Sequence, residues 1–284
     1  MTDSDGWFAN ANPDETDAAA RAVREGAARE PADWPALALE AGVADSQEAY
    51  YDALHEATMA ATKVAVEERE RADDRQLVHA VRAMDDCARV GNELAERFAE
   101  WAGSVDEEAE TGLEYARELA ASEPEPGQER LHSLATRVVD LQTEADELRA
   151  FVDERTPAVA PNLAALAGPV LASRLISLAG GLEKLAKQPS GTIQVLGAED
   201  ALFAHLRGHA PSPKHGIIYT HDAVRGTRKE DRGSAARALA GKLAIAARID
   251  HYSGDYRPEL EAELDERIET IQARAGDSSG GDDQ

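Results

Sequence analysis

The sequence predicts a mainly α-helical protein, on three observations. Alanine is abundant while aromatic residues make up only 5% of the 284 residues, and this favours helices packed closely through small side chains. Apolar residues recur at helical spacing over long stretches, and clusters of proline and glycine separate these stretches. We expect a small N-terminal domain, for which an α/β arrangement stays open, then an antiparallel coiled-coil hairpin and an all-helical C-terminal domain.

Residues 1–71 are expected to form the N-terminal domain. This stretch is acidic and alanine-rich, and prolines interrupt it. Trp7–Phe8 and Trp34–Leu39 are apolar anchors, and Ser46–Arg71 is predicted to be a helix.

Residues 72–156 carry two seams of apolar residues in a 4/3 spacing, which is typical of coiled coils. In the first seam the positions seven residues apart are Leu77, Met84, Gly91 and Phe98. Asp106–Ala121 is expected to continue helically. Glu123–Gly127, with two prolines and a glycine, breaks the helix. We expect a hairpin that self-associates into a homodimer, with an ordinary bundle face as the alternative. The dimerisation residues expected on the second seam are Leu131, Leu134, Val138, Leu141 and Leu148.

Residues 157–275 are expected to form the third domain, because Pro157 and Pro161 should end the second coiled-coil helix. Residues 276–284 are expected to be a disordered acidic tail. The helices expected in between are Asn162–Ala167, Pro169–Ala186 interrupted at Gly180–Gly181, Ile193–Leu206 with its start near Gly197, Ser234–Asp250 and Pro258–Ala275.

The charge distribution indicates an anionic partner. The chain carries a formal charge of −25, yet Lys184–Arg248 holds 11 Lys and Arg against 5 Asp and Glu. A basic stretch in a self-repelling acidic chain favours nucleic-acid binding, and internal pairing with the acidic arms is the alternative. On the predicted helix Ser234–Asp250, one face carries two cations around two small residues, which either admit a phosphate backbone or a neighbouring helix. That face consists of Arg237, Gly241, Ala244 and Arg248.

Other features limit the class of protein. The single cysteine, Cys87, allows no intrachain disulfide and fits a reducing cytosol. A signal peptide and a membrane-spanning stretch are not expected, so we expect a soluble, cytoplasmic protein. Arginine far outnumbers lysine on an acidic background, which suggests a halophilic source or simply a GC-rich genome. The sequence has no nucleotide-binding or hydrolase motif, and the pair His205 and His209 is only a weak metal signal.

Several motifs together resemble the Nop domain family. They are VAPNL at 159–163, SRLISLAGGL at 173–182, QVLGAE at 194–199, PKHGIIY at 213–219 and AARALAGKLAIAARID at 235–250. A fainter match covers DRQLVHAVRAMDD at 74–86 and Glu100–Trp101. The order and spacing are similar to archaeal fibrillarin-partner proteins of box C/D small ribonucleoproteins. The chain departs from the family pattern at Asp200, Ala204 and Ser234, where relatives carry cations.

The resemblance implies a scaffold without catalytic activity or cofactor. Its implied partners are a box C/D guide RNA with a kink-turn, a small kink-turn-binding protein, the methyltransferase fibrillarin docked on the N-terminal domain, and a second copy of the chain. The implied contacts to the duplex end and the kink-turn protein are Gln194, Glu199, Leu202 and Phe203. The candidate RNA-binding residues are Lys184, Lys214, His215, His221, Arg225, Arg228, Lys229, Arg232, Arg237, Lys242 and Arg248.

Two other classes of function stay open at this point. One is a metal-dependent hydrolase built around His205, His209 and His215. The other is a coiled-coil adaptor that binds no RNA.

Overall fold

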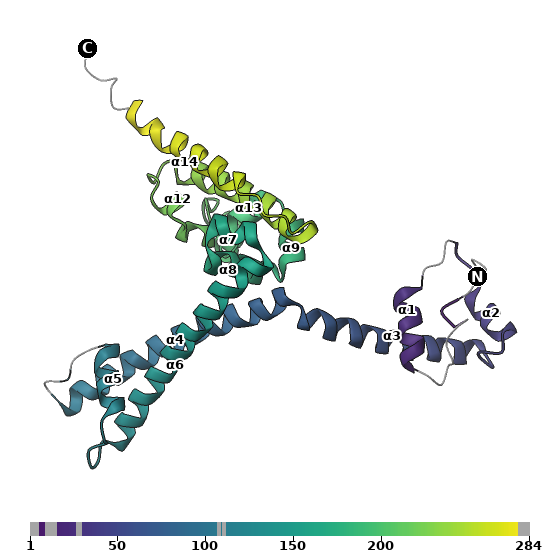
Figure 1. Ribbon diagram of the computed structural model, residues 1–284, viewed down its shortest axis with the longest axis horizontal. Helices are drawn as coiled ribbons and strands as arrows, with labels where there is room; N and C mark the ends of the chain where they lie inside the picture. The colour runs from purple at the N-terminus through teal and green to yellow at the C-terminus, as the bar shows by residue number, and fades with distance from the viewer. Residues whose placement is uncertain (1–5, 9–15, 27–29, 107–108, 110–111, 278–284) are drawn as a thin grey trace. The chain divides into compact units, whose positions relative to one another are not determined.

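The computed structural model describes residues 6–8, 16–26, 30–106, 109 and 112–277, and divides the chain into two compact units, 1–72 and 73–284. Every regular element in these residues is a helix (Figure 1). The prediction of a mainly α-helical protein is therefore confirmed.

The described residues of the first unit form three helices, α1 (Thr16–Glu25), α2 (Trp34–Glu40) and α3 (Gln47–Arg71). The Ser46 hydroxyl accepts a hydrogen bond from the N–H of Ala49 at 3.1 Å and so caps α3. An aromatic cluster of Trp7, Phe8 and Tyr50 joins the start of the chain to α3. The described part of this unit contains no strand, so the α/β arrangement finds no support.

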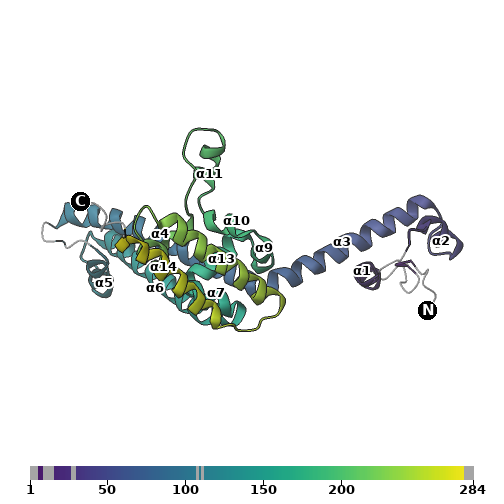
Figure 2. The same cartoon turned by 90° about the horizontal axis from the view of Figure 1, so that it is seen from above.

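The hairpin consists of α4 (Asp73–Val105), α5 (Leu113–Ala121) and α6 (Glu129–Val159). Helix α6 runs back along α4 and α5 after the proline-rich turn, and both views show α4 and α6 side by side (Figures 1 and 2). The sequence predicted that the helix continues over 106–121, and this prediction is wrong. Helix α4 ends at Val105, and α5 begins after Gly112, whose φ of 115° places it outside the helical region.

The second apolar seam closes the hairpin within one chain. Leu131 and Val138 are only 2% and 1% exposed and pack with Phe98 of α4 and Ala116 of α5. The other seam residues are half-buried: Leu134 lies against the same cluster and Leu148 against the main core. The expectation that these residues contact a second copy is wrong for Leu131 and Val138, because the chain's own helices already cover them.

The C-terminal helices share one core with the near end of the hairpin. Leu77 and Met84 of α4 and Val152 of α6 belong to the same buried cluster as Leu175 and Leu239. Residues 72–156 and 157–275 are therefore not separate compact units. Pro157 also does not end α6, which continues to Val159. Helix α7 then begins at Pro161.

Helix α13 (Arg232–Tyr252) is the central helix of this region. Its buried face extends along most of the helix and contains small residues such as Ala236, Ala240 and Ala247. It contacts α7, α9, α10 and α14. The expected helix Ile193–Leu206 is two helices, because Gly197 adopts φ 79° between them. The remaining elements are α7 (Pro161–Ala167), α8 (Pro169–Ala179), α9 (Leu182–Lys187), α10 (Ser190–Val195), α11 (Glu199–Leu206), η1 (Ile217–Thr220), α12 (Asp222–Arg225) and α14 (Glu259–Asp277).

A buried carboxylate ties together the ends of α7, α13 and α14. Asp250 accepts hydrogen bonds from the backbone N–H groups of Asn162 and Leu163, at 3.0 and 2.9 Å, and so caps the N-terminus of α7. Asn162 in turn accepts a bond from the backbone N–H of Arg257 at 2.7 Å, just before α14. Burial raises the pKa of the Asp250 carboxyl, against the opposing effect of these hydrogen bonds.

Polar contacts also dock α8 onto α4. Arg174 forms a two-pronged ion pair with Asp85, and the Nε of Arg82 donates to the Ser177 hydroxyl at 3.0 Å. The N–H of Leu182, which begins α9, donates to the Asp74 carboxylate at 3.0 Å. The motif at 74–86 thus supplies the hairpin residues that hold the C-terminal helices.

Two further expectations concern the ends of helices and membrane spans. Helix α14 extends to Asp277 rather than Ala275, and residues 278–284 of the expected tail lie outside the described residues. In the described part of the chain no single helix meets the length and apolarity of a membrane span. The bent pair of α7 and α8 meets the test only jointly, across a bend of 118°.

Candidate nucleic-acid interface

The predicted RNA-binding cations lie on α9, on the segment 214–232 and on α13. Their partners differ, and this decides which of them are available to an external anion. Three are engaged in ion pairs: Arg225 with Asp222 at 2.7 Å, Arg228 with Asp231 at 2.9 Å, and Lys242 with Glu263 of α14. Exposed pairs of this kind contribute about 0–1 kcal/mol, so a phosphate could replace the carboxylate partner of Arg225 or Arg228.

Two other arginines hold the fold together. The Nε of Arg248 donates to the carbonyl of Ala186 at 3.2 Å, and its second nitrogen donates to the carbonyl of Gln188 at 3.3 Å. These carbonyls end α9, where backbone acceptors lack helical partners and favour a cation. Arg232 donates to the carbonyl of Thr227 at 3.0 Å and lies 5.3 Å from the ring centre of Tyr219. Both arginines therefore have a structural role in the free chain, and their contact with RNA stays a prediction.

The two predicted histidines are also engaged within the fold. His221 uses both ring nitrogens: Nδ1 accepts from the N–H of Ala223 at 3.1 Å, and Nε2 lies 2.9 Å from the carbonyl of Leu166. It caps α12 and has no nitrogen left for RNA. His215 stacks on Tyr219 with ring centres 4.7 Å apart. Burial, reinforced by the nearby Arg232 and Lys214 and opposed by a backbone hydrogen bond, lowers the pKa of His215 and favours its neutral form.

Four of the predicted cations have no ion pair or hydrogen bond from their charged group to any residue that the structure describes. These side chains are exposed to solvent and available to an anion. They are Lys184, Lys214, Lys229 and Arg237.

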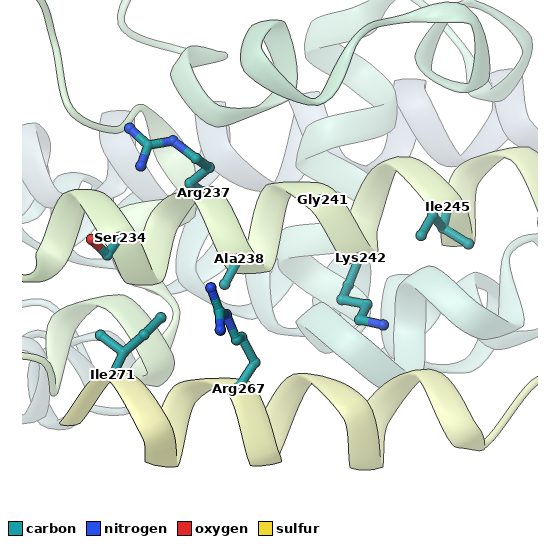
Figure 3. Close-up of a pocket in the computed structure, with 8 residues that line it drawn as sticks. All are labelled: Ser234, Arg237, Ala238, Gly241, Lys242, Ile245, Arg267 and Ile271. Carbon is teal, nitrogen blue, oxygen red and sulfur yellow. The ribbon is translucent and has the colours of Figure 1, made fainter. Parts of the chain in front are cut away.

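A groove of about 500 Å³ runs along α13 beside α14 (Figure 3). Figure 3 shows Arg237 on the upper side of α13, while Arg267 points from α14 toward α13 and Lys242 points down toward α14. Sequence reasoning missed Arg267 because it lies outside the basic stretch, on an acidic helix. Its spacing of three and four residues from Leu264 and Ile271 would have placed it beside the buried face. The lining residues are Ser234, Arg237, Ala238, Gly241, Lys242, Ile245, Arg267 and Ile271.

Only two of the four residues expected to share one face of α13 line the groove. Arg237 and Gly241 line it, whereas Ala244 is buried at 2% exposure and Arg248 is directed to the end of α9. A Cβ placed on Gly241 would meet no atom within 4 Å. Of the two small residues, Ala244 thus accommodates neighbouring helices, while Gly241 faces open space.

Comparison with known proteins places this geometry in a family. The family profile of Nop, described as "snoRNA binding domain, fibrillarin", matches residues 121–271, which is more than half of the chain. The chain belongs to the Nop family. The matched range begins at the end of α5 and includes the whole basic stretch and the groove with Arg267.

Individual relatives agree with this assignment. An uncharacterised NOP5 family protein of Methanocaldococcus jannaschii is 52% identical over 141 residues, covering 49% of this chain and 34% of that protein. Nucleolar protein 58 of Schizosaccharomyces pombe is 39% identical over 151 residues, covering 52% of this chain and 30% of that protein. The chain spans about a third of the length of the curated relatives it matches.

A solved structure extends the likeness over most of the chain. A chain in the crystal structure of a fibrillarin/Nop5p complex matches with a TM-score of 0.53 and 27% identity, covering 90% of this chain and 91% of that one. The Nop-family architecture therefore accounts for the helical fold.

The motifs expected at the duplex end lie on and beside α11, which projects from the rest of the unit in Figure 2. Gln194 donates to the carbonyl of Lys214 at 2.7 Å, and Glu199 accepts from the N–H of Gly197 at 2.8 Å. Both side chains thus shape the base of this projection. Leu202 is half-buried, whereas Phe203 is 57% exposed and remains available to a partner.

The hydrolase alternative finds no support in the structure. Nδ1 of His205 lies 3.0 Å from the carbonyl of Ala210. Across the described residues, no group of three or more His, Cys, Asp or Glu side chains could hold a metal ion, so His205, His209 and His215 do not form a centre.

Proposed function

We propose that this chain is the non-catalytic scaffold of a box C/D-type ribonucleoprotein that methylates ribose 2′-hydroxyls at sites chosen by a guide RNA. The family match over residues 121–271 carries the proposal, because it covers the surface on which the unpaired cations lie. The family's description names both snoRNA binding and fibrillarin. A coiled-coil adaptor without RNA accounts for neither Lys214 nor Arg237, since neither pairs with the described acidic residues.

In this proposal the RNA is a kink-turn held jointly with a small kink-turn-binding protein. The free cations Lys184, Lys214, Lys229 and Arg237 contact phosphates, while Phe203 contacts the end of the duplex. Arg225 and Arg228 exchange their surface carboxylates for phosphates on binding.

The test of RNA binding uses a labelled kink-turn RNA preassembled with the small protein. The triple variant Lys214→Glu, Lys229→Glu and Arg237→Glu should abolish assembly in a mobility-shift assay with an unchanged helical circular dichroism spectrum. A triple charge reversal of Arg97, Arg117 and Arg137, whose pairs lie within the hairpin, controls for net charge. Equal assembly by the two triple variants would refute the RNA assignment.

The methyltransferase partner is assigned to the first unit. Residues 1–71 fold separately from the basic surface, and α3 exposes Tyr51, Met59 and Val66 within one broad face. An exposed apolar face of this kind suits a protein partner. A fragment of residues 73–284 should lose recruitment of fibrillarin but keep RNA binding. Recruitment retained by the fragment would place the docking surface in the second unit.

Homodimerisation through the hairpin is the last part of the proposal. Since Leu131 and Val138 of the seam are buried within the chain, we assign self-association to more exposed apolar residues, and α4 offers Trp101 and Val105 at 44% and 51% exposure. The variant Trp101→Ser with Val105→Ser should be monomeric by light scattering under conditions where the wild type is a dimer. A wild-type chain that is already monomeric at micromolar concentration would refute homodimerisation but leave the rest of the proposed function unaffected.

A further inference from the structure

A glycine in the middle of α13 lacks a packing explanation among the residues that the structure describes. Gly241 lies nine residues from the start of the helix and eleven from its end. Glycine at such a position costs helix stability relative to alanine. Gly91 of α4 has a reason, since a Cβ there would lie 3.5 Å from the Cβ of Leu141 across the hairpin. At Gly241 the space is open, and the groove lies over it.

Cations stand on both sides of this open backbone. Arg237 comes from α13 and Arg267 from α14, and neither is paired within the portion of the chain that the structure describes. Helix α14 is otherwise acidic over Glu259–Glu269, so its one cation in that stretch is the one aimed at the groove (Figure 3). Glu263, which could have paired with Arg267 along the helix, pairs with Lys242 instead.

We propose that this groove seats the sugar-phosphate backbone of an RNA strand, with its closest approach over Gly241 and with Arg237 and Arg267 donating to phosphates on either side. The inference rests on the proposed RNA-binding function and adds the groove and Arg267 to it. Backbone approach to a side-chain-free helix surface is a use for glycine that requires a ligand outside the chain. Arginine fits the planar, two-pronged recognition of phosphate oxygens.

The dimensions and lining of the groove favour a strand over a small anion or an apolar peptide. Ser234 and Ile245 mark its ends on α13 and lie about 16 Å apart along the axis at 1.5 Å per residue. This length exceeds one phosphate group. Between them the floor consists of Ala238 and Gly241, which provide no deep apolar pocket for a peptide side chain. The groove therefore suits a narrow, repeating anion.

The first experiment fills the groove without changing charge. Gly241→Leu places a side chain where the backbone would approach, and Gly241→Ala is the matched small control. Both residues favour a helix over glycine, so both variants should unfold at or above the wild-type temperature. Affinity for the kink-turn RNA with its small protein should fall about tenfold or more for leucine, because displaced phosphates lose charge-assisted hydrogen bonds, and change little for alanine. Unchanged affinity of the leucine variant would overturn the proposal.

The second experiment removes the new cation. Arg267→Glu should lower affinity for the same RNA about tenfold and reduce the dependence of binding on salt by about one phosphate contact. Arg137→Glu in the hairpin carries the same charge change, and its affinity should stay near the wild-type value. If the wild type binds the RNA and the Arg267→Glu and Arg137→Glu variants bind it with equal affinity, the groove site is refuted but the proposed function is not. A wild-type chain that binds no RNA refutes the proposed function itself.

Discussion

At the scale of single residues, the role of a charge depends on its partner rather than its type. Arg248 and Arg237 are both exposed on α13, yet Arg248 satisfies the last carbonyls of α9 while Arg237 is free. A charge count over the basic stretch therefore overestimates the cations that an RNA can use. The same reasoning separates His221, which caps a helix, from Lys214, whose side chain lies along Gly233 with an unpaired charge.

Asp250 is the residue for which we expect the largest effect among the buried polar groups. In Asp250→Asn an amide N–H₂ must replace one of the oxygens that accept from Asn162 and Leu163. We expect the free energy of unfolding to fall by about 1–3 kcal/mol, because a buried donor is left without an acceptor. Chemical denaturation at neutral pH measures this change. A loss below a few tenths of a kcal/mol would show that the bonds do not stabilise α7.

The same variant tests the pKa direction of Asp250. A carboxyl with a raised folded-state pKa contributes stability below its unfolded pKa of about 3.9, and this is lost as pH rises through the folded pKa. The variant does not titrate at this position. The wild type minus variant difference in unfolding free energy should therefore shrink as pH rises above about 4. A difference that grows with pH would reverse the assigned direction.

At the scale of elements, the hairpin is closed by its own apolar seam. Phe98 of α4 is 1% exposed and lies 5.8 Å from Tyr115 of α5, ring centre to ring centre. Together with Leu131 and Val138 it forms a core separate from the one beneath α13. We therefore expect the far part of the hairpin to lose order without disturbing the C-terminal helices.

Truncation of Phe98 to alanine tests this separation. We expect the variant to lose about 3–5 kcal/mol of unfolding free energy, the usual range for a buried phenylalanine. Hydrogen exchange should accelerate at the far ends of α4 and α6, while the backbone amides of α13 stay protected. Uniform acceleration in both regions would mean that the hairpin and the C-terminal helices unfold as one.

At the scale of the whole molecule, net charge and partner binding oppose each other. A chain with a formal charge of −25 repels itself and also repels RNA outside its basic surface. Salt shortens the screening length from about 10 Å at 0.1 M to about 3 Å at 1 M. Repulsion within the fold is then reduced, and the proposed RNA binding has to rely on short-range contacts such as those proposed for the groove.

Salt should accordingly stabilise this protein. We expect the unfolding temperature to rise between about 0.1 M and 1 M potassium chloride, since screening weakens self-repulsion more than it weakens the scattered surface ion pairs. Differential scanning calorimetry measures the shift, with an uncharged osmolyte series as a control for water exclusion. An unfolding temperature that stays level or falls with salt would argue against the halophilic interpretation of the composition.

The sequence by itself determined the helical class and most of the helix breaks, because these depend on local chemistry. The two prolines and the glycine of Glu123–Gly127 and the pair Gly180–Gly181 separate helices through their own backbone geometry, and apolar periodicity marks the buried face of α6. Each family motif is a short run of consecutive residues, so the resemblance to the Nop family is visible in the sequence without knowledge of the fold.

Only the tertiary structure decided which charges are free and which seams are closed. Arg248 meets the carbonyl of Ala186, 62 residues away, and Lys242 meets Glu263 across two helices. Arg267 reaches the groove from an acidic helix that lies outside the basic stretch Lys184–Arg248. Such pairings depend on how helices pack, and neither periodicity nor composition carries that information, because each describes one helix while a site requires several.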